Sequence, residues 1–191
     1  MMPSKKMNPA IRLFLSLIRF PVFLHQNSLL CLTKSGKEFV AFNSKTVMAI
    51  NTAKYAEEAN IFVKQVAQEL GNPADINHAG RVTVAVLHTL REKITVPESI
   101  HLISQLPMIL KGVYVDGWDI SREMSQSDTL DEFLDELRQY SQRTAGRDFG
   151  DNQQAADHVK AVLRVMRNYV SEGEMRHIKE QMPGPLKVLF E

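Results

Sequence analysis

Two stretches of this sequence decide its fold: AGRVTVAVLHTLREKITVPESIHLISQLPMILKGVY at 79–114 and AADHVKAVLRVMRNYVSEGEMRHIKEQMPGPLKVLF at 155–190. They align without a gap at an offset of 76, and 11 of the 36 pairs are identical. Two similar helices could match through composition alone. These stretches also share a Thr or Ser followed three residues later by Glu, a proline break and an apolar tail. Together these features indicate an internal duplication.

Apolar residues recur at intervals of three and four through both copies and through the segments before them, which is typical of amphipathic helices. The preceding helices align through Phe62 and Phe133 at an offset of 71, so the second copy has about five extra residues around 144–151. We therefore expect an all-α fold. Two tandem-duplicated helical units, at about 53–118 and 129–191, pack as one compact bundle and are joined by a polar linker at 121–128.

Residues 1–47 differ in composition from the rest of the chain. They have a net charge of +6, which leaves −5 for residues 48–191. The apolar run at 11–24 is too short to span a bilayer and contains Arg12, Arg19 and Pro21. We predict an N-terminal extension outside the domain, disordered or not native to the mature protein, with a lone hairpin around 29–42. The alternative is a targeting or membrane-surface segment.

The helical part, residues 48–191, contains no cysteine, because the single Cys31 lies in the extension. A cysteine-free body suits a reducing compartment, and we expect a cytoplasmic protein without a transmembrane segment. A net charge of −5 lacks the electrostatic footprint of a nucleic-acid-binding domain, so we expect no nucleic acid for the helical body.

Sequence motifs that bring a known reaction are missing. The chain has no phosphate-binding glycine loop, no G-x-S-x-G elbow, no H-E-x-x-H and no C-x-x-C. The prediction therefore leans toward a protein that is not an enzyme, with no catalytic residues and no cofactor.

One repeated pattern could bind a metal ion. Each copy contains Glu-x-x-His on a predicted helix, as Glu98 with His101 and Glu174 with His177. Residues three apart share a helix face, and two such motifs with further carboxylates form the di-metal site of some four-helix bundles. The alternative function is therefore a helical bundle that binds iron, manganese or zinc, with extra carboxylates from Glu69, Glu92 or Glu136.

A structural role explains the same residues without a metal. Glu98 and Glu174 each follow a Thr or Ser by three residues, where a capping box places Glu. Gln105 and Gln181 precede the proline breaks, where a side-chain amide can satisfy open backbone groups. Arg91 and Arg167, near helix C-termini, suit the helix dipole; an anion site with Lys111 and Lys187 is the alternative.

Tyr114 and Trp118 follow a short helix and lie on either side of a tight turn. We expect them to fix the end of the first unit onto its core. The alternative is an exposed aromatic pair that binds a partner.

The most specific residues of the first copy are Gln105-Leu106-Pro107 and the run from Lys111 to Gly117-Trp118. With Ala85–Arg91, they resemble the bacterial domain-of-unknown-function family 2267, over roughly residues 53–191. The resemblance implies an uncharacterised helical bacterial domain and no activity. The second copy departs from the pattern at Pro183-Gly184-Pro185 and has no Gly-Trp. Because helices and a duplicated scaffold are present while catalytic motifs are missing, the most favoured function is a non-enzymatic cytoplasmic protein-interaction or adaptor module.

Overall fold

The computed structural model describes residues 22–25, 28–32, 39–41, 50–121, 124–125 and 128–191. The chain divides into two units, Met1–Ile50 and Asn51–Glu191, which we describe separately.

The first unit contains a three-stranded antiparallel sheet in the order β1-β2-β3. Its strands are β1 Val22–His25, β2 Ser28–Leu32 and β3 Phe39–Ala41. In the second pairing, Leu30 lies opposite Ala41 and Leu32 opposite Phe39. The hairpin expected around 29–42 corresponds to β2 and β3, and β1 was not predicted. The rest of the predicted extension lies outside the described residues.

The second unit is all-α, as predicted; between Asn51 and Glu191 the described residues contain no strand. Its first half consists of α2 Thr52–Glu69, α3 Ile76–Arg91, α4 Val96–Gln105 and α5 Met108–Val115. Gly71 follows the end of α2 with a φ of +76°. Glycine adopts this left-handed conformation without strain, which is why it is common just after a helix. α3 begins after Asp75, whose side chain caps the helix by accepting the His78 N–H.

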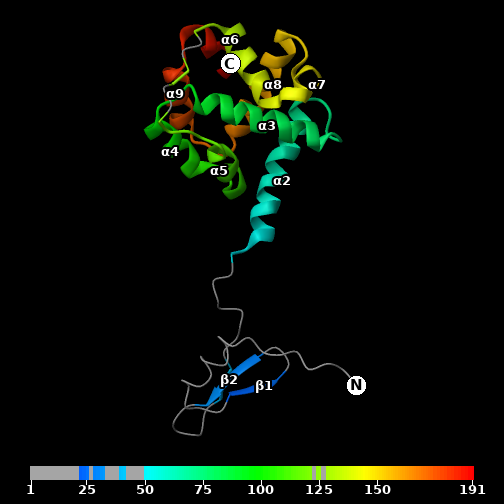
Figure 1. Ribbon diagram of the computed structural model, residues 1–191, viewed down its shortest axis with the longest axis vertical. Coiled ribbons are helices and arrows are strands. Elements are labelled where there is room, and N and C mark those ends of the chain that lie inside the picture. The colour runs from blue at the N-terminus through cyan, green and yellow to red at the C-terminus, as the bar shows by residue number, and fades with distance from the viewer. Residues whose placement is uncertain (1–21, 26–27, 33–38, 42–49, 122–123, 126–127) are drawn as a thin grey trace. The chain divides into compact units, whose positions relative to one another are not determined.

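The second half consists of α6 Leu130–Ser141, η2 Gln142–Thr144, α7 Ala145–Phe149, α8 Asn152–Met166, α9 Glu172–Gln181 and η3 Gly184–Phe190 (Figure 1). The extra residues expected around 144–151 form η2 and the short helix α7. They pack against α6, α8 and α3, so this insertion is a structured part of the body.

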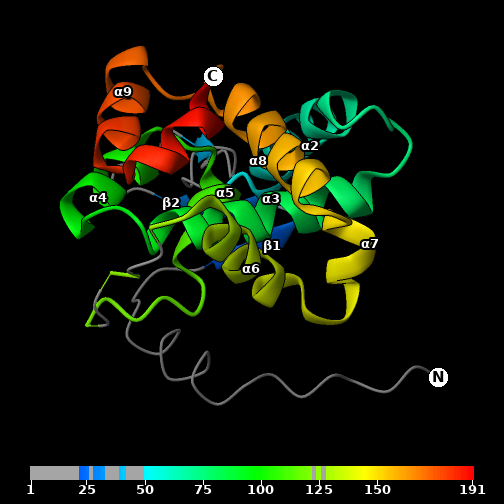
Figure 2. The same cartoon turned by 90° about the horizontal axis from the view of Figure 1, so that it is seen from above.

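Helix α3 lies at the centre of the body, where it contacts α2, α5, α6, α7 and α8 (Figures 1 and 2). Its buried residues include Val82, Val86 and Leu90, and the core around them contains Phe62 of α2 and Leu137 of α6. Burying one such side chain stabilises the fold by about 1.5–3 kcal/mol. The apolar stripes found in the sequence are therefore the residues that join the two halves into one core.

The helices of the two halves recur at the offset found in the sequence. α3, α4 and α5 begin 76 residues before α8, α9 and η3, respectively. One side-chain hydrogen bond recurs as well. Arg91 donates to the Tyr114 carbonyl, and Arg167 donates to the Phe190 carbonyl. The two arginines thus satisfy carbonyl groups near the ends of α5 and η3, respectively. A gene duplication as the origin of this likeness stays a prediction.

Candidate functional site

One of the contacts between the two halves is formed by two short antiparallel helices, α4 and α9. The Gln105 Oε1 atom at the end of α4 accepts the Ser171 N–H at the start of α9, at 2.7 Å. The Gln181 Oε1 atom at the end of α9 accepts the Thr95 N–H at the start of α4, at 2.9 Å. Each glutamine therefore satisfies an N-terminal backbone group of the opposite helix, in a reciprocal exchange.

Because of these hydrogen bonds, the capping boxes predicted for Glu98 and Glu174 do not form. In a capping box the Glu carboxylate accepts the N–H of the N-cap residue, but here the glutamines take those two N–H groups. Thr95 makes no side-chain cap hydrogen bond, and the Ser171 hydroxyl accepts only the backbone N–H of Glu174, at 3.3 Å. The carboxylates of Glu98 and Glu174 therefore do not complete capping boxes.

The same helix pair brings the two Glu-x-x-His motifs together. One potential ligand atom each from Glu98, Glu174 and His177 lies within 4.8 Å of the others. The Glu98 Oε1 atom is 3.8 Å from His177 Nδ1. Burial, the nearby charge of Glu98 and a side-chain hydrogen bond with Glu98 raise the pKa of Glu174, whereas the charges of His101 and His177 act in the opposite direction. Three of the four residues of the predicted metal set, Glu98, Glu174 and His177, therefore meet at this contact, and His101 lies outside this group of close ligand atoms.

The additional carboxylates suggested by the sequence lie elsewhere. Glu69 forms an ion pair with Arg164 at 2.8 Å, and Glu136 pairs with the buried Lys93 at 2.7 Å. Glu92 accepts a hydrogen bond from Arg91. A four-carboxylate, two-metal site of the four-helix-bundle type is therefore not what the described residues form.

Tyr114 and Trp118 do not form an exposed pair. Tyr114 is fully buried, and its hydroxyl group lies 2.8 Å from the hydroxyl oxygen of Ser99. The half-buried Trp118 ring packs edge-on against Tyr114 with 5.8 Å between ring centroids. The alternative that Tyr114 is exposed for a partner is therefore wrong, because its buried side chain holds α5 against α4.

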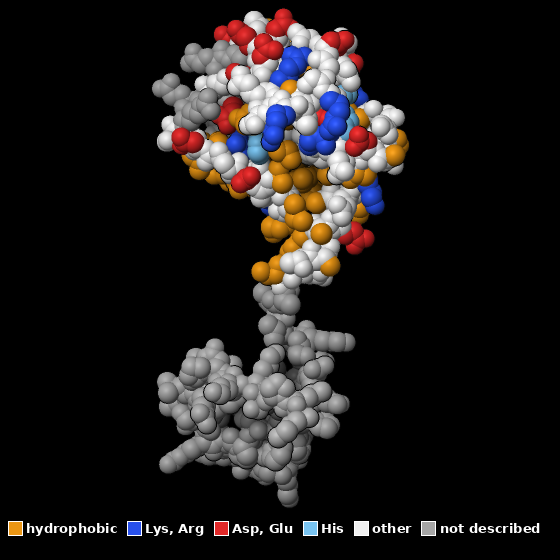
Figure 3. All heavy atoms as spheres, turned by 45° about the vertical axis from the view of Figure 1, so that its right-hand side comes forward, with side chains coloured by type: hydrophobic (Ala, Val, Ile, Leu, Met, Phe, Trp, Pro, Cys, Tyr) orange, Lys and Arg blue, Asp and Glu red, His pale blue; other side chains and the backbone are white. Residues whose placement is uncertain are grey.

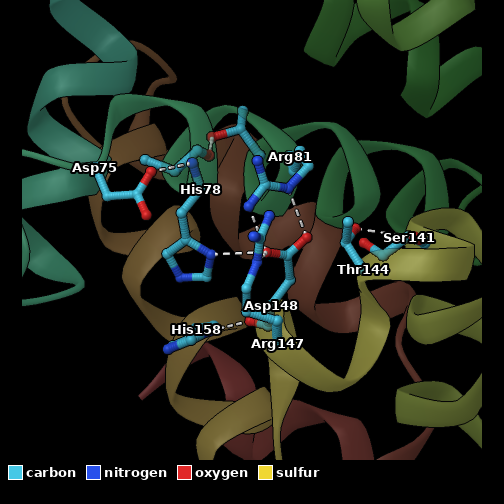
Figure 4. Close-up of polar contacts among 10 residues, drawn as sticks. Asp75, His78, Arg81, Ser141, Thr144, Arg147, Asp148 and His158 are labelled. Carbon is cyan, nitrogen blue, oxygen red and sulfur yellow. Dashed lines mark hydrogen bonds and ion pairs between the residues drawn. The ribbon is translucent and has the colours of Figure 1, made fainter.

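A polar cluster that the sequence analysis did not find fixes α7 to α3 (Figure 4). The buried Asp148 carboxylate accepts hydrogen bonds from Arg81 Nε and Nη2, each at 2.7 Å, and lies 3.0 Å from His78 Nδ1. Its backbone carbonyl accepts from His158 Nδ1 at 2.8 Å. Burial alone would raise the pKa of Asp148, but the hydrogen bonds from Arg81, Thr144 and His78 outweigh it and hold the pKa far below its usual range.

An apolar groove lies beside this cluster, between α2, α3, α5 and the end of α6. Its volume is about 580 Å³. Most lining side chains are apolar, including Val63, Val84 and Ile109, and Arg81 is the only charged residue among them. Hydrophobic side chains gather over α2 and the adjoining part of the body on the face that Figure 3 shows.

The sequence analysis missed Asp148, His78 and Arg81 because the contact between them joins segments that are distant in the chain. Asp148 belongs to the insertion in the second half, where no repeat partner drew attention to it. His78 and Arg81 do lie three apart on one face of α3, and that spacing was the available signal. Asp148, which both side chains contact, lies 67 residues from Arg81 in the sequence.

The fold defines the class: an all-α helical bundle in which two similar halves share one core. Among the residues that the structure describes, no helix is both long and apolar enough to cross a bilayer. The sequence pattern of the uncharacterised conserved protein family DUF2267 matches residues 59–189, and the chain belongs to this family. A comparison with curated proteins gave no match.

Proposed function

We propose that this protein is a non-enzymatic interaction module of the cytoplasm, and that the groove beside α3 binds an acidic amphipathic helix of a partner protein. The observation that carries the proposal is the groove itself, which combines an apolar lining with a single cation and no carboxylate among its lining residues. The cysteine-free helical body fits a reducing compartment.

The openness of the groove favours a helix over a small ligand. Val84 and Ile109 line it and retain 37% and 41% of their surface in solvent. A small apolar ligand would keep one side in water there. An amphipathic helix buries one face through side chains at i, i+3, i+4 and i+7 and keeps its polar face hydrated.

Charge favours an acidic partner. Arg81 lies at the end of the groove near α7, and Arg147 of α7, 71% exposed, lies next to the Asp148 carboxylate that Arg81 also contacts (Figure 4). The buried Asp148 carboxylate pairs with Arg81, and the charge of Asp75 also acts on Arg81, so the cation that this end presents to a partner is the exposed Arg147, although residues 48–191 are acidic overall. A partner helix with Asp or Glu at one end would find its opposite charge here, which sets orientation and speeds association.

A displayed library of helical peptides, selected on the full chain, tests the proposal. We expect the selected peptides to share an apolar face and an acidic end. Val84→Asp should weaken their binding more than tenfold, because it places a charge in the apolar groove. Arg147→Glu should weaken only peptides with an acidic end.

Ile100→Asp is the matched control, since Ile100 is an exposed apolar residue of α4 outside the groove lining. Peptide affinities that do not change in Val84→Asp would refute the proposal. So would a self-associated protein whose dimer Val84→Asp dissociates, because the groove would then be covered by a second copy of this chain.

A further inference from the structure

We propose that Glu98, Glu174 and His177, completed by His101, bind one divalent transition-metal ion between α4 and α9. This site is separate from the groove and does not depend on the interaction proposed above. It uses the same two positions from each half, a Glu and the His three residues later.

The geometry of the helix pair supplies the ligands from both sides. Since α4 and α9 run antiparallel, Glu98 of α4 lies close to Glu174 and His177 of α9 across the contact, and His101 follows Glu98 by three residues on α4. Three potential ligand atoms already lie within 4.8 Å of one another. Ligand atoms around a tetrahedral ion are about 3.4 Å apart, and the His177 side chain, 56% exposed, is free to rotate and close this difference.

Unsatisfied carboxylate oxygens point to a ligand at this place. The Oε1 atoms of Glu98 and Glu174 are buried and have no hydrogen-bond partner among the described residues. Glu174 is only 8% exposed. Buried polar atoms in folded proteins almost always have a partner, so two orphaned oxygens in one cluster call for an explanation. A bound cation provides the partner for both.

Electrostatics supports the same conclusion. The carboxylates of Glu98 and Glu174 lie close together in a poorly hydrated place, where two negative charges repel each other. The capping role that would explain two glutamates at these positions is absent, because Gln105 and Gln181 occupy the backbone groups concerned. A cation bound between the two carboxylates removes the repulsion between their ionised forms.

The donor set selects the class of metal. Carboxylate oxygens with imidazole nitrogens suit Zn²⁺, Mn²⁺ or Fe²⁺, whereas Mg²⁺ and Ca²⁺ prefer oxygen ligands alone. One ion is expected, since Glu69, Glu92 and Glu136 are paired at other places. For such ligands the affinity for Zn²⁺ should exceed that for Mn²⁺.

Calorimetric titration of the chelator-treated full chain with Zn²⁺ tests the site. We expect one equivalent to bind, and a Zn²⁺ concentration of 100 times Kd should raise Tm by roughly 5–10 °C. Glu174→Gln keeps the shape of the side chain but removes its charge, and we expect it to weaken Kd at least about tenfold, as metal-ligand changes do. The double variant His101→Ala/His177→Ala should lose the Tm shift.

Glu180→Gln is the matched control, because Glu180 is an exposed acid on the same helix α9 and is not part of the cluster. Circular dichroism establishes that each variant is folded before titration. Absence of any Zn²⁺-dependent Tm shift in the wild-type protein would overturn the proposal. Zn²⁺ binding of equal affinity in wild type and Glu174→Gln would also overturn it, since the ion would then bind elsewhere.

Discussion

Substituting Asp148 by Asn tests what holds α7 against α3. The substitution keeps the shape of the side chain and removes its charge. It weakens the paired hydrogen bonds from Arg81, both 2.7 Å long, and the contact with His78 at 3.0 Å. These are the contacts by which the second-half insertion is fixed to the central helix.

The expected loss follows from the burial of each partner. Removing one member of a buried ion pair costs about 3–5 kcal/mol. Asp148 is fully buried, but the Arg81 side chain is 32% exposed and can regain water, so we expect the lower end, about 3 kcal/mol. For a body of this size, 1 kcal/mol corresponds to roughly 2–4 °C, so Tm should fall by roughly 6–12 °C.

Urea and thermal denaturation between pH 7 and pH 3 provide the measurement. Because the folded-state pKa of Asp148 lies below its unfolded value, its charge stabilises the protein above about pH 4 and loses that effect as the pH falls further. The difference between wild type and Asp148→Asn should therefore narrow below pH 4.

Asp135→Asn is the control, since Asp135 pairs with Arg138 while 74% exposed; we expect a change within about 0.5 kcal/mol. An unchanged Tm for Asp148→Asn at pH 7 would refute the reasoning, and so would a difference between the two proteins that stays constant down to pH 3.

Further predictions concern three other contacts. Burial lowers the pKa of His158, so its neutral form stabilises the fold above about pH 6.5 and this contribution is lost as the pH falls; His158→Gln should flatten that part of the stability profile, and an unchanged slope would contradict it. Gln181→Ala leaves the Thr95 N–H without its acceptor and should cost about 1 kcal/mol in urea denaturation. Tyr114→Phe removes the hydroxyl contact with Ser99 and should cost about 1–2 kcal/mol. In a double-mutant cycle, adding Ser99→Ala should cost less than the sum, whereas strict additivity would show no coupling.

The all-α class was predictable from the sequence because helix periodicity is a local property of the chain. The stripe through Phe62 and Val66 and the one through Phe133 and Leu137 are visible as spacings of three and four. Those residues are buried in the structure. Family membership was equally accessible, since it rests on residues such as Gln105-Leu106-Pro107 that stand next to one another.

The capping boxes show where local reasoning fails. Thr95-Val96-Pro97-Glu98 has the sequence of a capping box, yet Gln181 from the opposite helix takes the backbone N–H. The box that does form is at Thr129 and Glu132, which the sequence analysis did not predict. A local hydrogen bond competes with every acceptor that tertiary packing brings near, and the sequence does not show those competitors.

The sequence by itself determined the all-α class of the second unit and the likeness of its two halves, because these follow from the spacing of apolar residues and from direct alignment. Only the tertiary structure decided that α4 and α9 lie antiparallel, that Glu98 meets Glu174 there, and that Asp148 meets Arg81 across 67 residues. Contacts between segments that are distant in sequence depend on how the side chains of neighbouring helices fit together in three dimensions. That packing is set by the whole core at once, so no local pattern in the chain encodes it.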